Sequence, residues 1–408
     1  MSNKLVLLGA GKIGRSFIGQ VFSRSGYEVV FVDINRQLVD KLNECRQYKV
    51  IIKSEKADET ILVTNVRAVH LDDTEKVIDE LSETSIAAIS VGQQGLPAAM
   101  HLIAQSLIKR KEKHGEWPLD IIIAENLRNA DLYFFSELSQ LLPSDYPLDK
   151  LVGLVETSIG KMVPIMSQKD MEADSLQVFA EAYNTLIVAK NDFKNPIPQV
   201  SALAPKENMK AWVDRKLFIH NLGHSTAAYL GYLSYPTATY MYEVLANSEL
   251  KEVVRNTMLQ AADILLKKYP EEFTIESLTD HIDDLLKRFQ NKALGDTIFR
   301  VGCDLQRKLS AEDRLAGAIH LARELKLPYD LILKALVCAC HFRATNEFGE
   351  MLTTDQNFVS IYKTGIENVL TLICKFNKTS DKEVIEKAIA FENLLMKDSN
   401  TSKIPSIC

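Results

Sequence analysis

Short apolar runs alternate with helical patterns along the first half of the chain. Each run is the kind that a parallel strand gives when both faces of its sheet are buried. Between the runs, apolar residues recur at helical spacing. The predicted strands are residues 4–8, 28–32, 86–91, 119–124, 151–155 and 186–190. This alternation predicts an α/β N-terminal domain of the Rossmann type, with an open, mostly parallel sheet.

The second half of the chain is helical almost throughout. The predicted helices are residues 207–233, 249–268, 277–290, 311–325, 329–341 and 382–397. Ser310 is expected to cap the helix at 311–325, with Asp313 at its third position. The segment Asn195-Pro-Ile-Pro198 interrupts the pattern and is the expected linker. We therefore predict two domains, residues 1–195 and an all-α domain of residues 196–408.

A glycine-rich turn follows the first predicted strand at once. Its sequence is Gly9-Ala10-Gly11-Lys12-Ile13-Gly14. In such a turn the first glycine permits the bend, the second lets a pyrophosphate approach the backbone, and the third lets helix pack on strand. The start of the helix adds unpaired N–H groups and a partial positive charge for phosphates. A turn without a ligand is the alternative, but its place directly after the first strand predicts that these six residues bind a dinucleotide.

Polar residues mark the carboxyl ends of three predicted strands. Asp33 ends the second strand, about 20 residues after the glycine turn, where an acid accepts hydrogen bonds from the adenosine ribose and would repel a 2′-phosphate. The predicted cofactor is therefore NAD. Gly92 and Asn126 follow two later strands, and ligands of open α/β sheets bind at this edge. Gly92 is predicted to contact the cofactor, while the position of Asn126 fits an ordinary turn residue equally well.

The predicted helix at 207–233 carries an unusual group of polar residues. At about 100° per residue, Lys216, His220, His224 and Asn221 fall within a sector of about 140°. Because each buried polar group needs a partner, a helix rarely buries such a face without a function. The alternative is a solvated face, since Lys is mostly exposed. The flanking apolar residues leave little room for a wet face, and Gly223 would let a backbone or a ligand approach this helix closely.

Basic residues gather in two segments of the C-terminal half. They are Arg300, Arg307 and Lys308 in the first segment, and His341 and Arg343 in the second. Such groups are suited to binding an anionic substrate. Helix capping and solvated charge explain them as well. Both interpretations stay open from the sequence.

Composition and charge restrict the class of protein. The chain has 408 residues and a net charge of -6, which argues against a nucleic-acid or anionic-membrane surface. No apolar run reaches the length of about 18 residues that a membrane span needs. The six cysteines match neither a disulfide framework nor a zinc site. We expect a reduced, cytoplasmic protein that binds no metal.

With these residues placed, the chain resembles the polyol-specific long-chain dehydrogenase family. The resemblance runs from the N-terminus to at least Arg343. The motifs that carry it are Gly-Ala-Gly-Lys-Ile-Gly-Arg-Ser-Phe-Ile-Gly at 9–19, Ala-Glu-Asn at 124–126, Arg-Lys-Leu-Phe-Ile-His-Asn-Leu-Gly-His at 215–224, Arg-Lys-Leu-Ser-Ala-Glu-Asp-Arg-Leu at 307–315 and His-Phe-Arg at 341–343. The spacing Lys-x4-Asn-x2-His is the distinguishing signature.

The resemblance implies a metal-independent, NAD-dependent dehydrogenase with two domains. It implies that Lys216 is the general acid/base, that Asn126 and Asn221 hold the oxygen of the reacting alcohol, and that His224 orients the substrate. Within the family, it points to a polyol phosphate substrate and to the interconversion of mannitol 1-phosphate and fructose 6-phosphate. Full-size members of the family are often monomeric, so the resemblance implies a monomer.

One segment departs from the family pattern. Where the family usually has Asp-Arg-Ile-Val-Pro, this chain has Gly160-Lys161-Met-Val-Pro. The family's Asp contacts substrate hydroxyls, so the identity of the polyol stays open. The alternatives are the same chemistry on another polyol, polyol phosphate or sugar acid, or a nucleotide-binding regulator without turnover.

Overall fold

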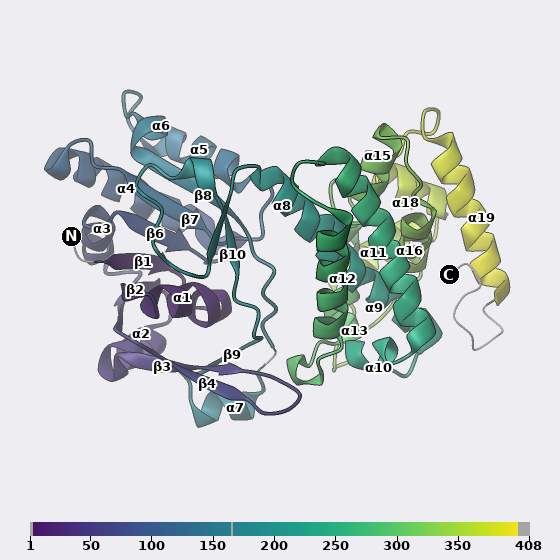
Figure 1. Ribbon diagram of the computed structural model, residues 1–408, viewed down its shortest axis with the longest axis horizontal. Helices are drawn as coiled ribbons and strands as arrows, with labels where there is room; N and C mark the ends of the chain where they lie inside the picture. Colours follow the sequence, from purple (N-terminus) through teal and green to yellow (C-terminus); the bar gives the residue numbers. More distant parts are fainter. Residues whose placement is uncertain (1–2, 165, 399–408) are drawn as a thin grey trace. The chain divides into compact units, whose positions relative to one another are not determined.

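The computed structural model describes residues 3–164 and 166–398 and forms two compact units. The first unit extends to Val213 and the second begins at Asp214. The first unit is a Rossmann-type α/β fold and the second is helical (Figure 1). The predicted fold class is therefore confirmed.

The first unit is built on an eight-stranded sheet. Its order is β11-β10-β8-β7-β6-β1-β2-β5. All neighbours pair in parallel except β10 and β8, which are antiparallel. The strands are β1 (Lys4–Leu8), β2 (Glu28–Asp33), β5 (Val66–His70), β6 (Ile86–Ile89), β7 (Leu119–Ile123), β8 (Val152–Ser158), β10 (Leu186–Ala189) and β11 (Leu203–Lys206). The carboxyl ends of β1, β2, β6 and β7 consequently lie along one edge.

Helices cover both faces of this sheet (Figure 1). Alternate residues of the strands belong to different cores. Leu5 and Leu7 pack with residues of α1 (Gln20–Ser23) and α2 (Arg36–Cys45). Val6 and Leu8 pack with α3 (Thr74–Ser82), α4 (Leu96–His114) and α5 (Ala130–Leu141). Burial on both faces is the physical reason that these strands are continuous apolar runs in the sequence.

A second, three-stranded sheet was not predicted. Its order is β4-β3-β9, with β3 (Gln47–Ile52), β4 (Glu59–Thr64) and β9 (Val178–Ala180). The edge strands β5 and β11 of the large sheet were also missed. Strand β11 follows the Asn195-Pro-Ile-Pro198 segment and pairs with β10, so the first unit continues beyond the linker that we expected.

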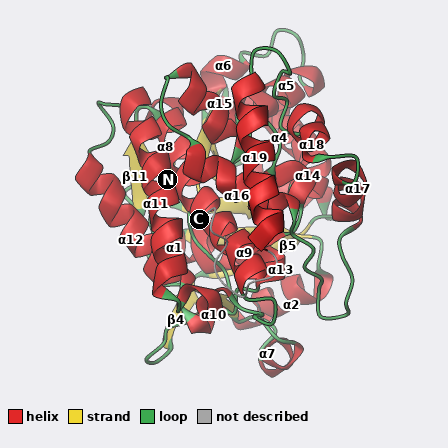
Figure 2. Ribbon diagram, turned by 90° about the vertical axis from the view of Figure 1, so that its right-hand side faces the viewer, coloured by secondary structure: helices red, strands yellow, loops and turns green. Residues whose placement is uncertain are grey.

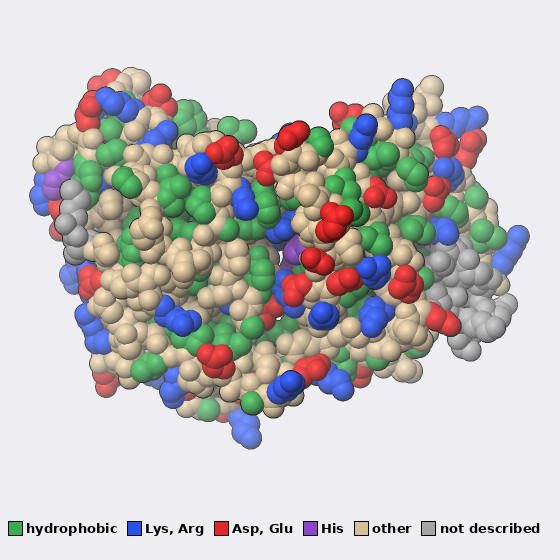
Figure 3. Space-filling model, in the orientation of Figure 1, with side chains coloured by type: hydrophobic (Ala, Val, Ile, Leu, Met, Phe, Trp, Pro, Cys, Tyr) green, Lys and Arg blue, Asp and Glu red, His purple; other side chains and the backbone are tan. Residues whose placement is uncertain are grey.

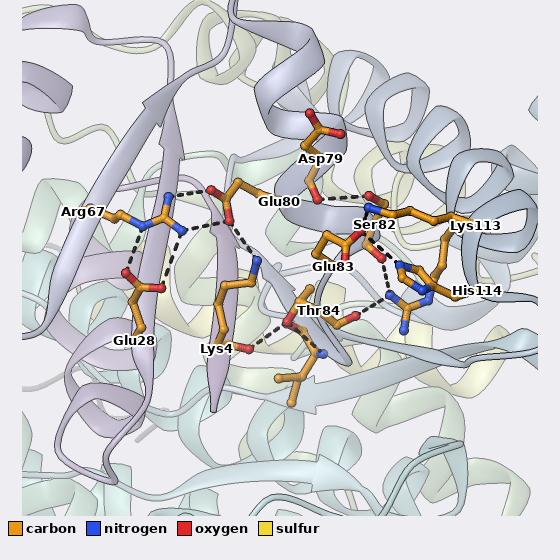
Figure 4. Close-up of polar contacts among 12 residues, drawn as sticks. Lys4, Glu28, Arg67, Asp79, Glu80, Ser82, Glu83, Thr84, Lys113 and His114 are labelled. Atoms are coloured by element: carbon orange, nitrogen blue, oxygen red, sulfur yellow. Dashed lines mark hydrogen bonds and ion pairs between the residues drawn. The ribbon is translucent and has the colours of Figure 1, made fainter. Parts of the chain in front are cut away.

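An ion-pair network lies at the amino ends of the strands, on the edge opposite the glycine turn. Figure 4 shows the guanidinium of Arg67 between the carboxylates of Glu28 and Glu80. The Lys4 ammonium at the start of β1 donates to the same Glu80 at 2.9 Å. The network joins β1, β2, β5 and α3, and bidentate geometry of this kind is the stronger class of surface ion pair.

The second unit is made of helices (Figure 2). They are α9 (Leu222–Ser234), α10 (Met241–Leu245), α11 (Ser248–Lys268), α12 (Ile275–Phe289), α13 (Ile298–Gly302), α14 (Leu305–Lys308), α15 (Ala316–Glu324), α16 (Asp330–Cys340), α17 (Thr353–Tyr362), α18 (Ile366–Leu372) and α19 (Lys382–Asp398). Helix α9 packs against α11, α13 and α16 and is the centre of this unit. Its residues from Ser225 to Gly231 are buried.

Two predicted helices differ from the structure. The helix predicted for residues 207–233 consists of α8 (Met209–Arg215), a π-helical segment η4 (Lys216–Asn221) and α9. The helix predicted for 311–325 begins only at Ala316, so Ser310 is not its cap. Residues 311–315 form turns instead, and there the N–H and guanidinium of Arg314 both donate to the carboxylate of Asp313.

Surface properties agree with an ordinary globular chain. On the face drawn in Figure 3, basic and acidic side chains are interspersed. None of the helices within residues 3–164 and 166–398 is long and apolar enough to cross a membrane.

Candidate active site

The glycine turn at the end of β1 is enforced by close packing. Gly9 has a φ of 98°, and a Cβ on it would lie 2.3 Å from the carbonyl oxygen of Ser90. A Cβ on Gly14 would lie 2.1 Å from the carbonyl oxygen of Gly9. A Cβ on Gly11 would meet nothing within 4 Å, so this side of the backbone is open to a ligand. The turn therefore has the tight bend and the open approach that a pyrophosphate needs.

Four other predicted cofactor residues lie in or beside this turn: Ala10, Lys12, Ile13 and Asp33. Ala10 is buried, and its N–H donates to Oδ2 of Asp33 at 2.7 Å. Oδ1 of Asp33 accepts from the N–H of Asn35 at 2.9 Å. Each carboxylate oxygen keeps acceptor capacity for a ribose hydroxyl. Lys12 is exposed and Ile13 half-buried at the start of the helix, which is π-helical from Gly14 to Gly19.

The ends of β6 and β7 are joined by a carboxylate that was not predicted. The N–H of Gly92, a residue with a φ of 73°, donates to Oε1 of Glu125 at 2.8 Å. Burial raises the pKa of Glu125. Asn126 is the next residue and is exposed in the first unit. Gly92 and Asn126 thus lie at the carboxyl edge of the sheet, where the glycine turn and Asp33 also lie.

Lys216 begins the π-helical segment η4 of the second unit. A π-helical turn takes in one more residue than an α-helical turn, and such turns occur often at functional sites. Lys216 and Asn221 are five residues apart, so they lie on the same side of the helix rather than at the angles of the α-helical projection. Lys216 is half-buried, and burial, then the charge of Arg314, lowers its pKa to about 8. Nη1 of Arg314 donates to the carbonyl oxygen of Asn221 at 3.4 Å.

The imidazole of His224 lies among aromatic and cationic groups. Its ring stacks on Phe289, with centroids 4.3 Å apart and planes 6° from parallel. Its Nε2 lies 3.4 Å from Oδ2 of the buried Asp296. Burial lowers the pKa of His224 well below its ordinary value, and four cationic groups lower it further. These are Arg300, Lys308, Arg314 and Arg288. His220 is buried against Phe289 and its pKa is also lowered by burial.

The predicted substrate-binding residues separate into three groups. Arg300 contacts Asp296, and Lys308 is buried with its Nζ donating to the carbonyl oxygen of Val301 at 2.7 Å. Both lie near enough to His224 to influence its titration. Arg307 is ion-paired with two aspartates, Asp304 at 2.5 Å and Asp313 at 3.2 Å.

His341 and Arg343 belong to other surroundings. Nε2 of His341 lies 3.0 Å from the hydroxyl of Tyr362, which donates to Glu392 at 2.6 Å. Arg343 lies over the ring of Tyr362 and borders a cavity of about 500 Å³. The other residues that line this cavity are Tyr232, Pro236, Ala238, Thr239, Tyr240, Thr297, Ile298, Phe299, Ala344, Thr345, Asn346 and Glu347. None of these contacts links His341 or Arg343 to His224, so their role in substrate binding stays a prediction.

At residues 160 and 161 the sequence departs from the family pattern, and the structure shows a role for Lys161. Lys161 is buried, and its ammonium donates to the carbonyl oxygens of Glu181 and Tyr183 and to Oδ1 of Asn184, at 2.7–3.0 Å. The lysine therefore fixes the loop at 181–184. Gly160 supplies no carboxylate at the position of the family's Asp.

Three residues that organise the site were missed from the sequence: Asp296, Phe289 and Glu125. Asp296 follows Gly295, which is left-handed with a φ of 63°, and this turn was the available signal. Arg314 belongs to the family motif at 307–315, which assigns it no role in the site. Within the described part of the chain, no group of three or more His, Cys, Asp or Glu side chains is arranged to hold a metal.

Comparison with known proteins decides the family. The model of the mannitol dehydrogenase Rossmann domain matches residues 3–202, and that of the mannitol dehydrogenase C-terminal domain matches residues 208–396. The chain belongs to the mannitol dehydrogenase family. The family resemblance predicted from the motifs is thereby confirmed, as is the expectation of a polyol dehydrogenase.

Individual relatives within the mannitol dehydrogenase family match over nearly the whole chain. The chain is 31% identical to a mannitol-1-phosphate 5-dehydrogenase of Buchnera aphidicola subsp. Acyrthosiphon pisum, over 97% of this chain and 99% of that protein. It is 32% identical to a mannitol-1-phosphate 5-dehydrogenase of Caldanaerobacter subterraneus subsp. tengcongensis, over 94% and 97% of the two chains.

Solved structures show the same fold. A D-sorbitol dehydrogenase in substrate-free form has a TM-score of 0.80 at 16% identity, covering 98% of this chain and 94% of that one. The Pseudomonas fluorescens mannitol 2-dehydrogenase, in a ternary complex with NAD and D-mannitol, has a TM-score of 0.76 at 14% identity, covering 98% and 93%.

Proposed function

We propose that this chain is an NAD-dependent, metal-independent dehydrogenase that interconverts mannitol 1-phosphate and fructose 6-phosphate, with Lys216 as its general acid/base. The observation that carries the chemistry is a half-buried amine with a pKa of about 8 on a π-helical segment. General acid–base catalysis works best when the pKa lies near the working pH. The names of the full-length relatives supply mannitol 1-phosphate as the polyol, and oxidation of its C5 hydroxyl gives fructose 6-phosphate.

The first unit fits NAD. The open side of Gly11 and the tight turn at Gly9 suit a pyrophosphate, and the carboxylate of Asp33 suits a ribose diol. When bound, the nicotinamide accepts or gives the hydride. In polyol oxidation, the neutral amine of Lys216 takes the proton of the reacting hydroxyl. The carboxamides of Asn221 and Asn126 donate to that oxygen, and preorganised donors of this kind stabilise its developing charge.

The charges around His224 favour a phosphorylated substrate over a neutral polyol. Arg300, Lys308, Arg314 and Arg288 all contribute positive potential there. The carboxylates beside these cations are Asp296, which contacts Arg300, Asp313, which contacts Arg314, and Asp284, which contacts Arg288. The buried ammonium of Lys308 has no carboxylate contact among the described ion pairs, so a phosphate group would accept a charge-assisted hydrogen bond from it, and such bonds are among the stronger polar contacts.

The test is NADH oxidation against a panel of free and phosphorylated ketoses and of keto-uronates. We expect fructose 6-phosphate to give the highest kcat/KM, and dialysis against a chelator to leave the rate unchanged. Preference for another ketose or a keto-uronate would retain the chemistry and overturn the substrate. A substrate other than fructose 6-phosphate would agree with the absence, at Gly160, of the carboxylate that the family uses to contact substrate hydroxyls. Absence of NADH oxidation across the panel would instead support the regulator.

Cofactor choice is expected to depend on Asp33. The carboxylate would repel the 2′-phosphate of NADP, so NAD should be the better cofactor by kcat/KM. Asp33→Ala should narrow that difference. Because Asp33 also accepts the N–H of Ala10, Asp33→Asn is the matched variant that keeps an acceptor and removes only the charge. Equal efficiency of wild-type protein with both cofactors would contradict this assignment.

A further inference from the structure

A buried carboxylate joins two of the predicted substrate-binding residues. Asp296 is 4% exposed and lies between the short helix η5 (Lys292–Leu294) and α13. One carboxylate oxygen lies 3.4 Å from Nε2 of His224, and the other contacts the guanidinium of Arg300. Burying a charge is costly unless partners surround it, so a carboxylate at this position calls for an explanation.

The backbone on both sides of Asp296 is held firmly. Its carbonyl oxygen accepts from the N–H of Met241 at 2.9 Å. The N–H of Ile298, two residues later, donates to the carbonyl oxygen of Thr239 at the same distance. The hydroxyl of Thr297 caps α13 by accepting the N–H of Arg300 at 3.1 Å. The carboxylate is therefore presented from a fixed main chain.

Most buried carboxylates among the described residues accept hydrogen bonds from backbone N–H groups, but the carboxylate of Asp296 does not. Asp355, for comparison, accepts two backbone N–H groups at 2.9 and 2.6 Å. Among the residues that the structure describes, neither oxygen of Asp296 accepts a hydrogen bond of good geometry, and Nε2 of His224 also lacks one. Its contacts are with two side chains of the candidate active site instead.

We propose that Asp296 is a positioning residue, which sets the tautomer of His224 and the orientation of Arg300 for the substrate. Phe289 fixes the plane of the imidazole by stacking, and the carboxylate of Asp296 lies beside its Nε2. A carboxylate beside Nε2 favours the tautomer with its proton on that nitrogen. Nδ1 is then left as an acceptor for a substrate hydroxyl. The inference rests on the proposed function, because it assumes that His224 contacts substrate.

Because His224 is neutral, its tautomer decides which ring nitrogen donates a hydrogen bond and which accepts one. A neutral imidazole has one donor and one acceptor, whereas a protonated ring has two donors. The pKa of His224 lies well below its ordinary value, so its contact with Asp296 is not an ion pair. Charged and titratable groups that face this ring are Arg288 on α12, Asp296 and Arg300 near and on α13, Lys308 on α14, Arg314 before α15 and His220 on η4, which leads directly into α9.

The first test reads the tautomer directly and needs no turnover. Nitrogen-15 NMR of protein labelled at histidine, with His224 assigned from His224→Gln, reports which ring nitrogen carries the proton. We expect Nε2 in the wild-type protein and Nδ1 in Asp296→Asn, whose amide would donate instead. A proton on Nδ1 of the wild-type ring would overturn the proposal, even if the variant failed to fold. Inactivity of wild-type protein on the ketose panel would overturn the proposed function and leave this readout intact.

The second test is kinetic and uses whichever ketose the panel identifies. Asp296→Asn should lower kcat/KM about 10–100-fold, by analogy with the cost of losing a residue that orients a metal-binding histidine. In the His224→Gln background the same substitution should cost less than in the wild-type protein, because only the contact with Arg300 is left to lose. The matched control is Asp381→Asn, another buried carboxylate of the second unit, which contacts Arg323. A merely structural Asp296 would lower the melting temperature as Asp381→Asn does and leave kcat/KM and the tautomer unchanged.

Discussion

Lys216→Ala is expected to lower turnover by about 10²–10⁴-fold, because general acid–base catalysis contributes about that factor. NADH affinity should change little, since the glycine turn and Asp33 belong to the other unit. Lys216→Arg should lose as much activity, because a guanidinium keeps its proton. Lys210→Ala, at an exposed position of α8, is the control and should retain the wild-type rate. Added small amines should partly restore Lys216→Ala.

The pH dependence follows from the sign of the lysine's charge. The pKa of Lys216 is lowered to about 8, so the amine is neutral above that pH and protonated below it. Polyol oxidation needs the neutral base, and its kcat/KM should rise with pH and level off above about 8. Ketose reduction needs the protonated acid and should fall above the same pH. Lys308 titrates near the same pH, so the profile is measured in Lys308→Met as well.

The solvated-face interpretation of Lys216 makes a different prediction. An exposed lysine would give normal turnover and less than about 0.5 kcal/mol of change in the free energy of unfolding. Wild-type activity in Lys216→Ala would overturn the role of general acid/base. A melting curve accompanies the kinetics, so that loss of fold is not mistaken for loss of chemistry.

The parts of this fold that the sequence predicts are those with strong local patterns. Residues 4–8 are apolar because β1 is buried on both faces, and the glycine turn follows because packing leaves no room for a Cβ on Gly9 or Gly14. The small sheet combines a local and a distant pairing: β3 alternates buried and exposed residues and pairs with its sequence neighbour β4, but its other partner, β9, comes from far along the chain. No local pattern near residue 47 indicates that pairing.

The candidate site shows the same division between local and distant causes. The Lys-x4-Asn-x2-His signature marks the segment that contains the π-helical turn, yet an α-helical projection puts Lys216 and Asn221 at the wrong angles. Helix propensity does not reveal the extra residue of a π-helical turn. Asp296 was missed for another reason, since its contact with His224 exists only once α9 packs beside α13.

Substrate discrimination is expected to depend on Lys308. This residue is buried beside the candidate site, and burial lowers its pKa to about 8, which marks an ammonium poorly compensated by the protein. If a phosphate dianion binds there, Lys308→Met removes one charge-assisted hydrogen bond. We expect kcat/KM for fructose 6-phosphate to fall about 10–100-fold, from about 1.5–3 kcal/mol for a hydrogen bond to a charged group. The value for free fructose should change little.

The comparison between the two substrates separates recognition from structure. Nζ of Lys308 also donates to the carbonyl oxygen of Val301, so a structural role would lower activity on both ketoses equally. Lys267→Met makes the same substitution at an exposed position of α11 and should leave both values unchanged. In wild-type protein, KM for fructose 6-phosphate should rise above about pH 8 as Lys308 loses its proton. An equal loss on both substrates in Lys308→Met, or a KM independent of pH, would remove Lys308 from the phosphate site and leave Arg300 as the candidate for that contact.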